Sequence, residues 1–143
     1  MKKITYLLFI VFAVAGFTSC QSKTQKLIVK KWDCVQVENL SPVDLHYATK
    51  EDSANATKFE TALKALSWTF NSNGSYNCST INGMITVQGT YEISSDEKTL
   101  TCTSSSGNNS NTYTITSIED FGMILTSTSI GASAPLIMHF SPH

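Results

Sequence analysis

The sequence predicts an all-β domain of eight short antiparallel strands, with one short helix between the first and second strands. From Val29 onward, apolar and polar residues alternate in short runs, which is the pattern of half-buried strands. Two Asn-Gly pairs, at 73–74 and 82–83, mark tight hairpins, because both residue types tolerate a positive φ. Only the segment 54–66 has apolar residues at helical spacing. From these residues alone, the strands could form either a closed barrel or a tight sandwich.

The first expected strand covers residues 29–38, and a polar loop follows it. Phe59, Leu63 and Leu66 then lie at the spacing of one helix face, which predicts a short amphipathic helix over 54–66. Turn residues separate the remaining runs. The other strands are expected at 67–70, 75–78, 85–93, 99–103, 113–115, 123–125 and 136–140.

The N-terminus has the three zones of an export signal. Lys2 and Lys3 supply the positive charge, and 4–17 is an apolar run too short to span a bilayer. The junction 16–20 resembles a lipobox, the site at which a signal peptidase cuts before a cysteine that becomes lipidated. We therefore expect residues 1–19 to be a lipoprotein signal peptide and Cys20 to carry acyl chains such as palmitate.

Three segments follow from this interpretation. Residues 1–19 are the signal, 20–28 are the lipidated cysteine with a flexible tether, and 29–143 are a single β domain. The resemblance to envelope lipoproteins implies a protein anchored to the membrane of the cell envelope. Because the residues after Cys20 include lysines rather than a run of acids, the outer membrane with a periplasm-facing domain is the favoured location.

Composition argues against nucleic-acid binding. All 10 basic residues of the chain are lysines, so the planar guanidinium fork that usually clamps phosphates and reads bases is missing. The formal net charge is −1, and it becomes more negative once Lys2 and Lys3 are removed with the signal. No nucleic acid is therefore expected among the partners.

Three cysteines remain after Cys20, and they fall on the first, third and fifth expected strands: Cys34, Cys78 and Cys102. These strands are not neighbours in a meander. A disulfide would therefore have to cross the interior with its Cα atoms within about 7 Å of one another. Small buried thiols that pack as apolar residues are the favoured interpretation.

No catalytic, cofactor or metal site is predicted. His46, His139 and His143 have no Cys, Asp or Glu nearby at metal-ligand spacing. A nucleophilic pair of Cys34 with His139 is conceivable, but no flanking signature supports it. The acidic pairs at 51–52, 96–97 and 119–120 lie at turns, where solvated charge is the ordinary explanation.

Several segments together carry a family resemblance. Their order and spacing, between Val29 and Phe140, resemble the lipocalin-like lipoproteins of the Bacteroidetes. The resemblance implies an eight-stranded antiparallel meander barrel with an apolar interior, and no enzymatic activity has to accompany it. The resemblance also implies that the Trp32 side chain closes one end of the barrel. The segments are Lys31-Trp32-Asp33, the hairpin 68–76, Gly89-Thr90-Tyr91-Glu92-Ile93 and Tyr113-Thr114-Ile115-Thr116.

Two functions are compatible with this prediction. The leading hypothesis is a lipid-anchored, non-enzymatic envelope lipoprotein whose barrel binds a small apolar ligand. The alternative is a protein-interaction module, an inhibitor or accessory subunit of an envelope complex, with a filled core. The candidate cavity-lining residues are Trp32, Phe70, Tyr76, Tyr91, Ile93, Leu100, Tyr113, Ile115, Leu125, Met138 and Phe140.

One candidate modification site lies before the expected helix. Asp52-Ser53-Ala54 resembles the acceptor for O-glycosylation in Bacteroidetes envelope proteins, with Ser53 as the acceptor. The same serine can serve as a helix N-cap, which is the favoured interpretation.

Overall fold

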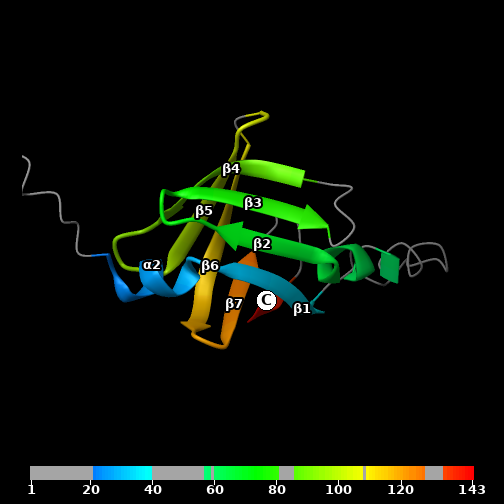
Figure 1. Cartoon of the computed structure of the whole chain (residues 1–143). Helices are drawn as coiled ribbons and strands as arrows, with labels where there is room; N and C mark the ends of the chain where they lie inside the picture. Colours follow the sequence, from blue (N-terminus) through cyan, green and yellow to red (C-terminus); the bar gives the residue numbers. More distant parts are fainter. Residues whose placement is uncertain (1–20, 40–56, 59, 81–85, 108, 128–133) are drawn as a thin grey trace, which may run out of the picture.

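The computed structural model describes residues 21–39, 57–58, 60–80, 86–107, 109–127 and 134–143 (Figure 1). Several sequence predictions lie outside these residues. They are the signal at 1–19, Cys20, His46, Ser53 and the Asn82-Gly83 hairpin.

Eight antiparallel strands close into one barrel in sequence order, which confirms the predicted meander. Each strand pairs with its neighbour along the chain, and β1 also pairs with β8 to complete the closure. Inward-facing apolar side chains form one continuous core. The strands are β1 (Lys31–Glu38), β2 (Leu66–Phe70), β3 (Ser75–Thr80), β4 (Thr86–Ile93), β5 (Thr99–Ser104), β6 (Ser110–Glu119), β7 (Gly122–Ser127) and β8 (Leu136–Pro142).

The predicted helix between β1 and β2 is present. Thr57, Lys58 and residues 60–64 are helical, and the Lys64 ammonium lies 2.6 Å from the Glu60 carboxylate one turn away. Leu66 was expected in this helix, but it opens β2, where it pairs with Thr80. Leu66 is therefore partly buried against the barrel core as a residue of β2 and not as a residue of the helix.

A second helix, α2 (Lys23–Ile28), covers one end of the barrel. We call this the closed end; the β2–β3, β4–β5 and β6–β7 turns and the C-terminus also lie there. The sequence predicted a flexible tether for this segment. The structure differs because a capping box joins Ser22 to Gln25 and because Ile28 is fully buried.

The β2–β3 hairpin follows the Asn-Gly prediction, with one difference. Of the two residues, only Gly74 has a positive φ, at 82°. The Asn71 carbonyl accepts a hydrogen bond from the Gly74 amide, and the Asn71 amide donates to the Ser75 carbonyl. This is the arrangement of a turn followed by a left-handed residue, so glycine is required only at the second position.

Gly89 allows β4 and β5 to approach closely. A Cβ atom at this position would lie 1.9 Å from the Thr103 carbonyl oxygen and 2.8 Å from the Tyr76 ring. Neither a backbone carbonyl nor a buried ring can move easily out of the way. The glycine therefore fixes the local bend of β4 and the position of Tyr76 in the core.

Replacing Gly89 with alanine should therefore destabilise the barrel. Overpacking of this kind costs about 1–3 kcal/mol or more, and we expect Gly89→Ala to lower the free energy of unfolding by at least that amount. Urea denaturation of the mature domain measures it. Gly107→Ala is the control, because its nearest neighbour would be a side-chain nitrogen at 3.7 Å, so its effect should stay within about 0.5 kcal/mol. Equal stability of the two variants would contradict this role.

Candidate functional site

The barrel interior is the first candidate site, and the structure packs most of the predicted lining residues there. Eight of them belong to the buried core, and Tyr91, Ile93 and Tyr113 are partly buried against it. The eight are Trp32, Phe70, Tyr76, Leu100, Ile115, Leu125, Met138 and Phe140.

Trp32 seals the closed end. Its side chain is fully buried, and the indole Nε1 donates a 2.9 Å hydrogen bond to the Ile28 carbonyl at the end of α2. The Lys30 ammonium lies 5.1 Å from the centre of the Trp32 ring, within the range of a cation–π contact. Ile28 is itself fully buried, so helix and indole form one well-packed cap.

Trp68 crosses the interior. From β2, its ring makes edge-on contacts with the rings of Tyr113 in β6 and Phe140 in β8. The ring centres are 5.4 Å and 5.7 Å apart, respectively. The side chain is 5% exposed, yet its Nε1 donor has no hydrogen-bond partner among the residues that the structure describes. A buried donor without a partner costs about 1–3 kcal/mol, so this N–H is a candidate hydrogen-bond donor to a bound molecule.

The surroundings of Trp68 are apolar and neutral. Cys34, Cys78 and Cys102 are all free thiols inside the barrel. Burial raises the pKa of Cys34 and Cys78 to about 11 and that of Cys102 to about 12. Burial likewise raises the pKa of the Tyr113 hydroxyl. At neutral pH these groups are uncharged, so the interior suits an uncharged ligand.

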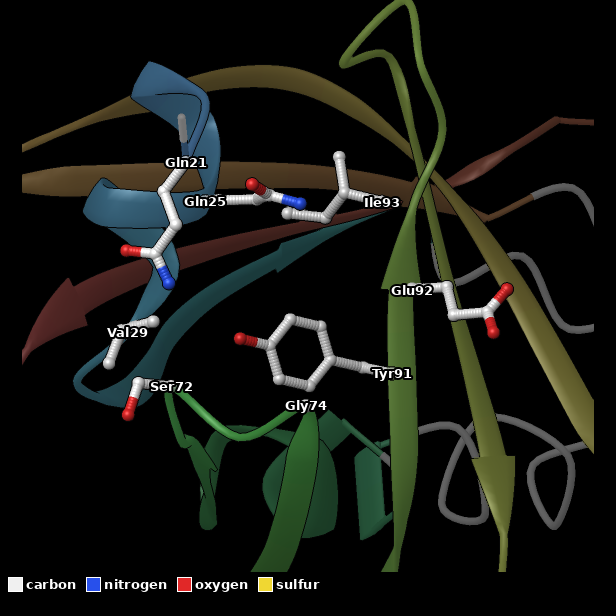
Figure 2. A pocket seen from close by; sticks show the side chains of 8 residues that line it. All are labelled: Gln21, Gln25, Val29, Ser72, Gly74, Tyr91, Glu92 and Ile93. Carbon is white, nitrogen blue, oxygen red and sulfur yellow. The ribbon is translucent and has the colours of Figure 1, made fainter. Parts of the chain in front are cut away.

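The second candidate is a groove of about 380 Å³ at the closed end (Figure 2). It lies between the start of α2 and β4. Tyr91 points into it, whereas Glu92 points away on the other side of its strand. The Tyr91 hydroxyl donates a 2.9 Å hydrogen bond to the Asn71 carbonyl, which holds the ring in place. The lining residues are Gln21, Gln25, Val29, Ser72, Gly74, Tyr91, Glu92 and Ile93.

Glu97 fastens α2 to the barrel. Its carboxylate accepts hydrogen bonds from the Thr24 hydroxyl at 2.5 Å and from the Thr24 amide at 3.3 Å. The hydroxyl bond, helped by the amide, lowers the pKa of Glu97 below its ordinary value. Glu97 also has a positive φ of 60°, which is uncommon for this residue type. A residue 73 positions away thus fixes the wall of the groove.

The structure does not bring the conceivable nucleophile pair together. Cys34 is buried inside the barrel, opposite Phe140. His139 directly precedes Phe140 in β8, and its ring lies 2.8 Å from the Glu38 carboxylate on the other face of the sheet. Among the described residues, no group of three or more His, Cys, Asp or Glu is placed to hold a metal ion.

Sequence reasoning missed three contributors to these sites. Trp68 was not among the predicted lining residues, although it alternates with Phe70 and strand periodicity would have placed both on the inner face. Gln21 and Gln25 were assigned to a tether, although Ser22 and Gln25 have the spacing of a capping box.

No helix in the described part of the chain is long and apolar enough to cross a membrane.

The Thr24–Glu97 contact predicts a pH-dependent attachment of α2. Because the pKa of Glu97 is lowered, its stabilisation is present above the ordinary pKa of a glutamate and is lost as the pH falls through the folded value. Thr24→Val should return the pKa of Glu97 toward its ordinary value and speed amide exchange in α2. An NMR titration measures both effects. Thr112→Val, on an exposed strand position, is the control; an unchanged Glu97 titration in Thr24→Val would refute the contact.

The thiols should be unreactive in the folded protein. A pKa raised from 9 to about 11 lowers the thiolate fraction about a hundredfold at a given pH. We expect slow alkylation by iodoacetamide at mildly alkaline pH, with Cys78 first because it alone of the three described cysteines is partly exposed. Mass spectrometry of digests identifies the site. In urea all three should react quickly, and earlier modification of Cys34 or Cys102 would contradict the burial order.

Comparison with known proteins supports the fold. No family model matches the chain, and neither does any curated protein sequence. A lipocalin-like protein from Bacteroides uniformis superposes with a TM-score of 0.53 at 11% identity, over 81% of this chain and 98% of that chain. A DUF4847 family protein from Bacteroides vulgatus gives 0.51 at 14% identity, over 84% and 96%. At these identities the likeness concerns the fold alone, and it confirms that this fold is lipocalin-like.

Proposed function

We propose that this protein is a lipid-anchored, non-enzymatic envelope protein that binds a small neutral amphiphile inside its barrel. The observation that carries the proposal is the buried Trp68 Nε1 donor, which has no partner within the described ranges of the chain. A ligand with one hydrogen-bond acceptor would satisfy it. The lipocalin-like barrel supports a binding role, because an eight-stranded barrel can enclose one small molecule.

The chemistry around Trp68 selects the class of ligand. The aromatic rings of Tyr113 and Phe140 and the neutral thiols offer dispersion contacts but no charge partner. Moving an unpaired carboxylate or ammonium into such an interior is unfavourable. The acceptor is therefore a carbonyl, ester or hydroxyl oxygen on an apolar chain. A fatty-acid ester and an isoprenoid alcohol both fit this description.

Inward-facing residues of intermediate burial mark the least tightly covered part of the interior, where a ligand would have to displace side chains. Cys78, Val87 and Tyr113 pack against the core without being fully covered. By contrast, Phe70 and Leu100 are almost completely buried. The ligand is therefore expected beside Trp68 on the side of Cys78 and Val87, and not in the tightly filled part of the core.

The anchoring part of the proposal rests on the N-terminal sequence. A short apolar run precedes Cys20, and small residues lead into that cysteine. Acyl chains on Cys20 would hold the protein at a membrane, because two or more chains bind stably where one does not. The location we propose is the periplasmic face of the outer membrane.

A protein-interaction module is the second candidate function. The well-filled part of the core favours it, as does Val35, whose side chain is 54% exposed on the outer face of β1. Such a module would use the outer surface and leave the interior empty of ligand. Ligand capture therefore separates the two functions.

Native mass spectrometry of the mature domain, produced in the periplasm with Cys20 replaced, tests the ligand. We expect an excess mass that denaturation removes, or uptake of a fatty-acid methyl ester or an isoprenoid alcohol added as probe. Trp68→Phe keeps an aromatic ring but removes the donor, and one such hydrogen bond should make probe binding about tenfold weaker.

Thr112→Val, on the exposed face of β6, is the matched control and should bind the probes as the wild type does. A clean mass without uptake of either probe would overturn the carrier function and favour the interaction module. Binding that is equal in the wild type and Trp68→Phe would overturn the role of the indole donor.

A further inference from the structure

We propose that the closed end of the barrel lies against the lipid bilayer, with Phe121 inserted at the membrane interface. This inference rests on the lipid anchor of the proposed function and adds an orientation and a contact surface. It joins three observations: the position of Gln21, the attachment of α2 and the exposure of Phe121.

The anchor would begin at the closed end. Gln21 lines the groove between α2 and β4. Cys20 directly precedes Gln21 in the sequence, so a single peptide bond joins the expected lipid-bearing residue to this end of the barrel. Acyl chains on Cys20 would therefore bring the closed end to the membrane without an intervening linker.

The attachment of α2 makes this orientation rigid. The Glu97 carboxylate holds Thr24 at the start of the helix, and Trp32 holds Ile28 at its end. Both Thr24 and Ile28 are buried. A domain on a flexible tether could present any face to the bilayer, but a helix fixed at both ends allows little rotation about the anchor.

Phe121 supplies the apolar contact. It lies in the turn between β6 and β7, and 76% of its surface is exposed, which is the largest value among the described large apolar residues. The Lys30 ammonium donates a 3.2 Å hydrogen bond to the Asp120 carbonyl, so this turn is tied to the link between α2 and β1. Phe121 thus projects at the same end as the anchor, where an aromatic ring can enter the interface.

The charges at this end are mixed. Five lysines and six carboxylates lie there, and the Asp120 carboxylate lies 3.9 Å from the Lys30 ammonium. Attraction to anionic lipids is therefore largely cancelled, and burial of the aromatic ring provides the contact. Vesicles of neutral and of anionic lipid should accordingly give the same result. The charged side chains are Lys23, Lys26, Lys30, Lys31, Asp33, Glu92, Asp96, Glu97, Lys98, Glu119 and Asp120.

Tryptophan fluorescence of the full lipoprotein tests the orientation. The protein is purified in detergent and reconstituted into phosphatidylcholine vesicles, with or without lipids brominated midway along one acyl chain. The indole of Phe121→Trp should shift its emission to the blue and lose most of it to the brominated lipid. Thr112→Trp, near the opposite end of β6, should keep its emission. The signal of buried Trp32 and Trp68 is subtracted with the unmodified protein.

Flotation of the same samples tests the lipid anchor separately from the orientation of the barrel. If the protein fails to float with vesicles, or if Cys20→Ala floats equally well, the anchor is wrong and the orientation falls with it. If the protein floats but Phe121→Trp is not quenched, the anchor stands and the orientation is overturned. Concentration-dependent shielding of that tryptophan from iodide, without quenching by brominated lipid, would instead assign the surface to a second copy of the chain.

Discussion

The pairing of β1 with β8 is the constraint on which the rest of the structure depends, because it closes the sheet. Closure pairs the backbone hydrogen-bonding groups of two edge strands that other chains could otherwise bind. It also fixes which side chains face inward. A bulge between Cys34 and Gln36 adjusts this pattern in β1. Trp32, Cys34 and Val37 all face the core, whereas Val35 and Gln36 are exposed. The exposed valine is thus a consequence of register.

The two buried tryptophans differ in whether the indole N–H finds a hydrogen-bond partner. Trp32 and Trp68 are both buried indoles, yet Trp32 donates to the Ile28 carbonyl, whereas no described residue accepts from the Trp68 Nε1. The difference follows from position. α2 brings backbone carbonyls to one end, whereas the neighbours of Trp68 are aromatic rings and thiols. A polar ligand atom can therefore supply in the middle of the barrel what the helix supplies at its end.

The strands were predictable from the sequence because alternation and turn residues are local signals. Ser67 and Trp68 already lie on opposite faces by period alone, and Gly74 marks its turn. α2 was not predictable from periodicity, because six residues give too few turns for a helical pattern. The groove could not be predicted either, because it joins three segments of the chain. Contacts such as Thr24 with Glu97 leave no trace in either local sequence.

The cap at the closed end also constrains how a ligand could enter. Ile28 and Trp32 are fully buried and hydrogen-bonded to one another, so opening that end would expose both side chains and break this hydrogen bond. With the closed end against the bilayer, a lipid would not pass directly from the membrane into the interior. Exchange would occur at the opposite end, away from the anchor. A carrier built this way would take its cargo from solution or from another protein, and the membrane beneath it would serve as support.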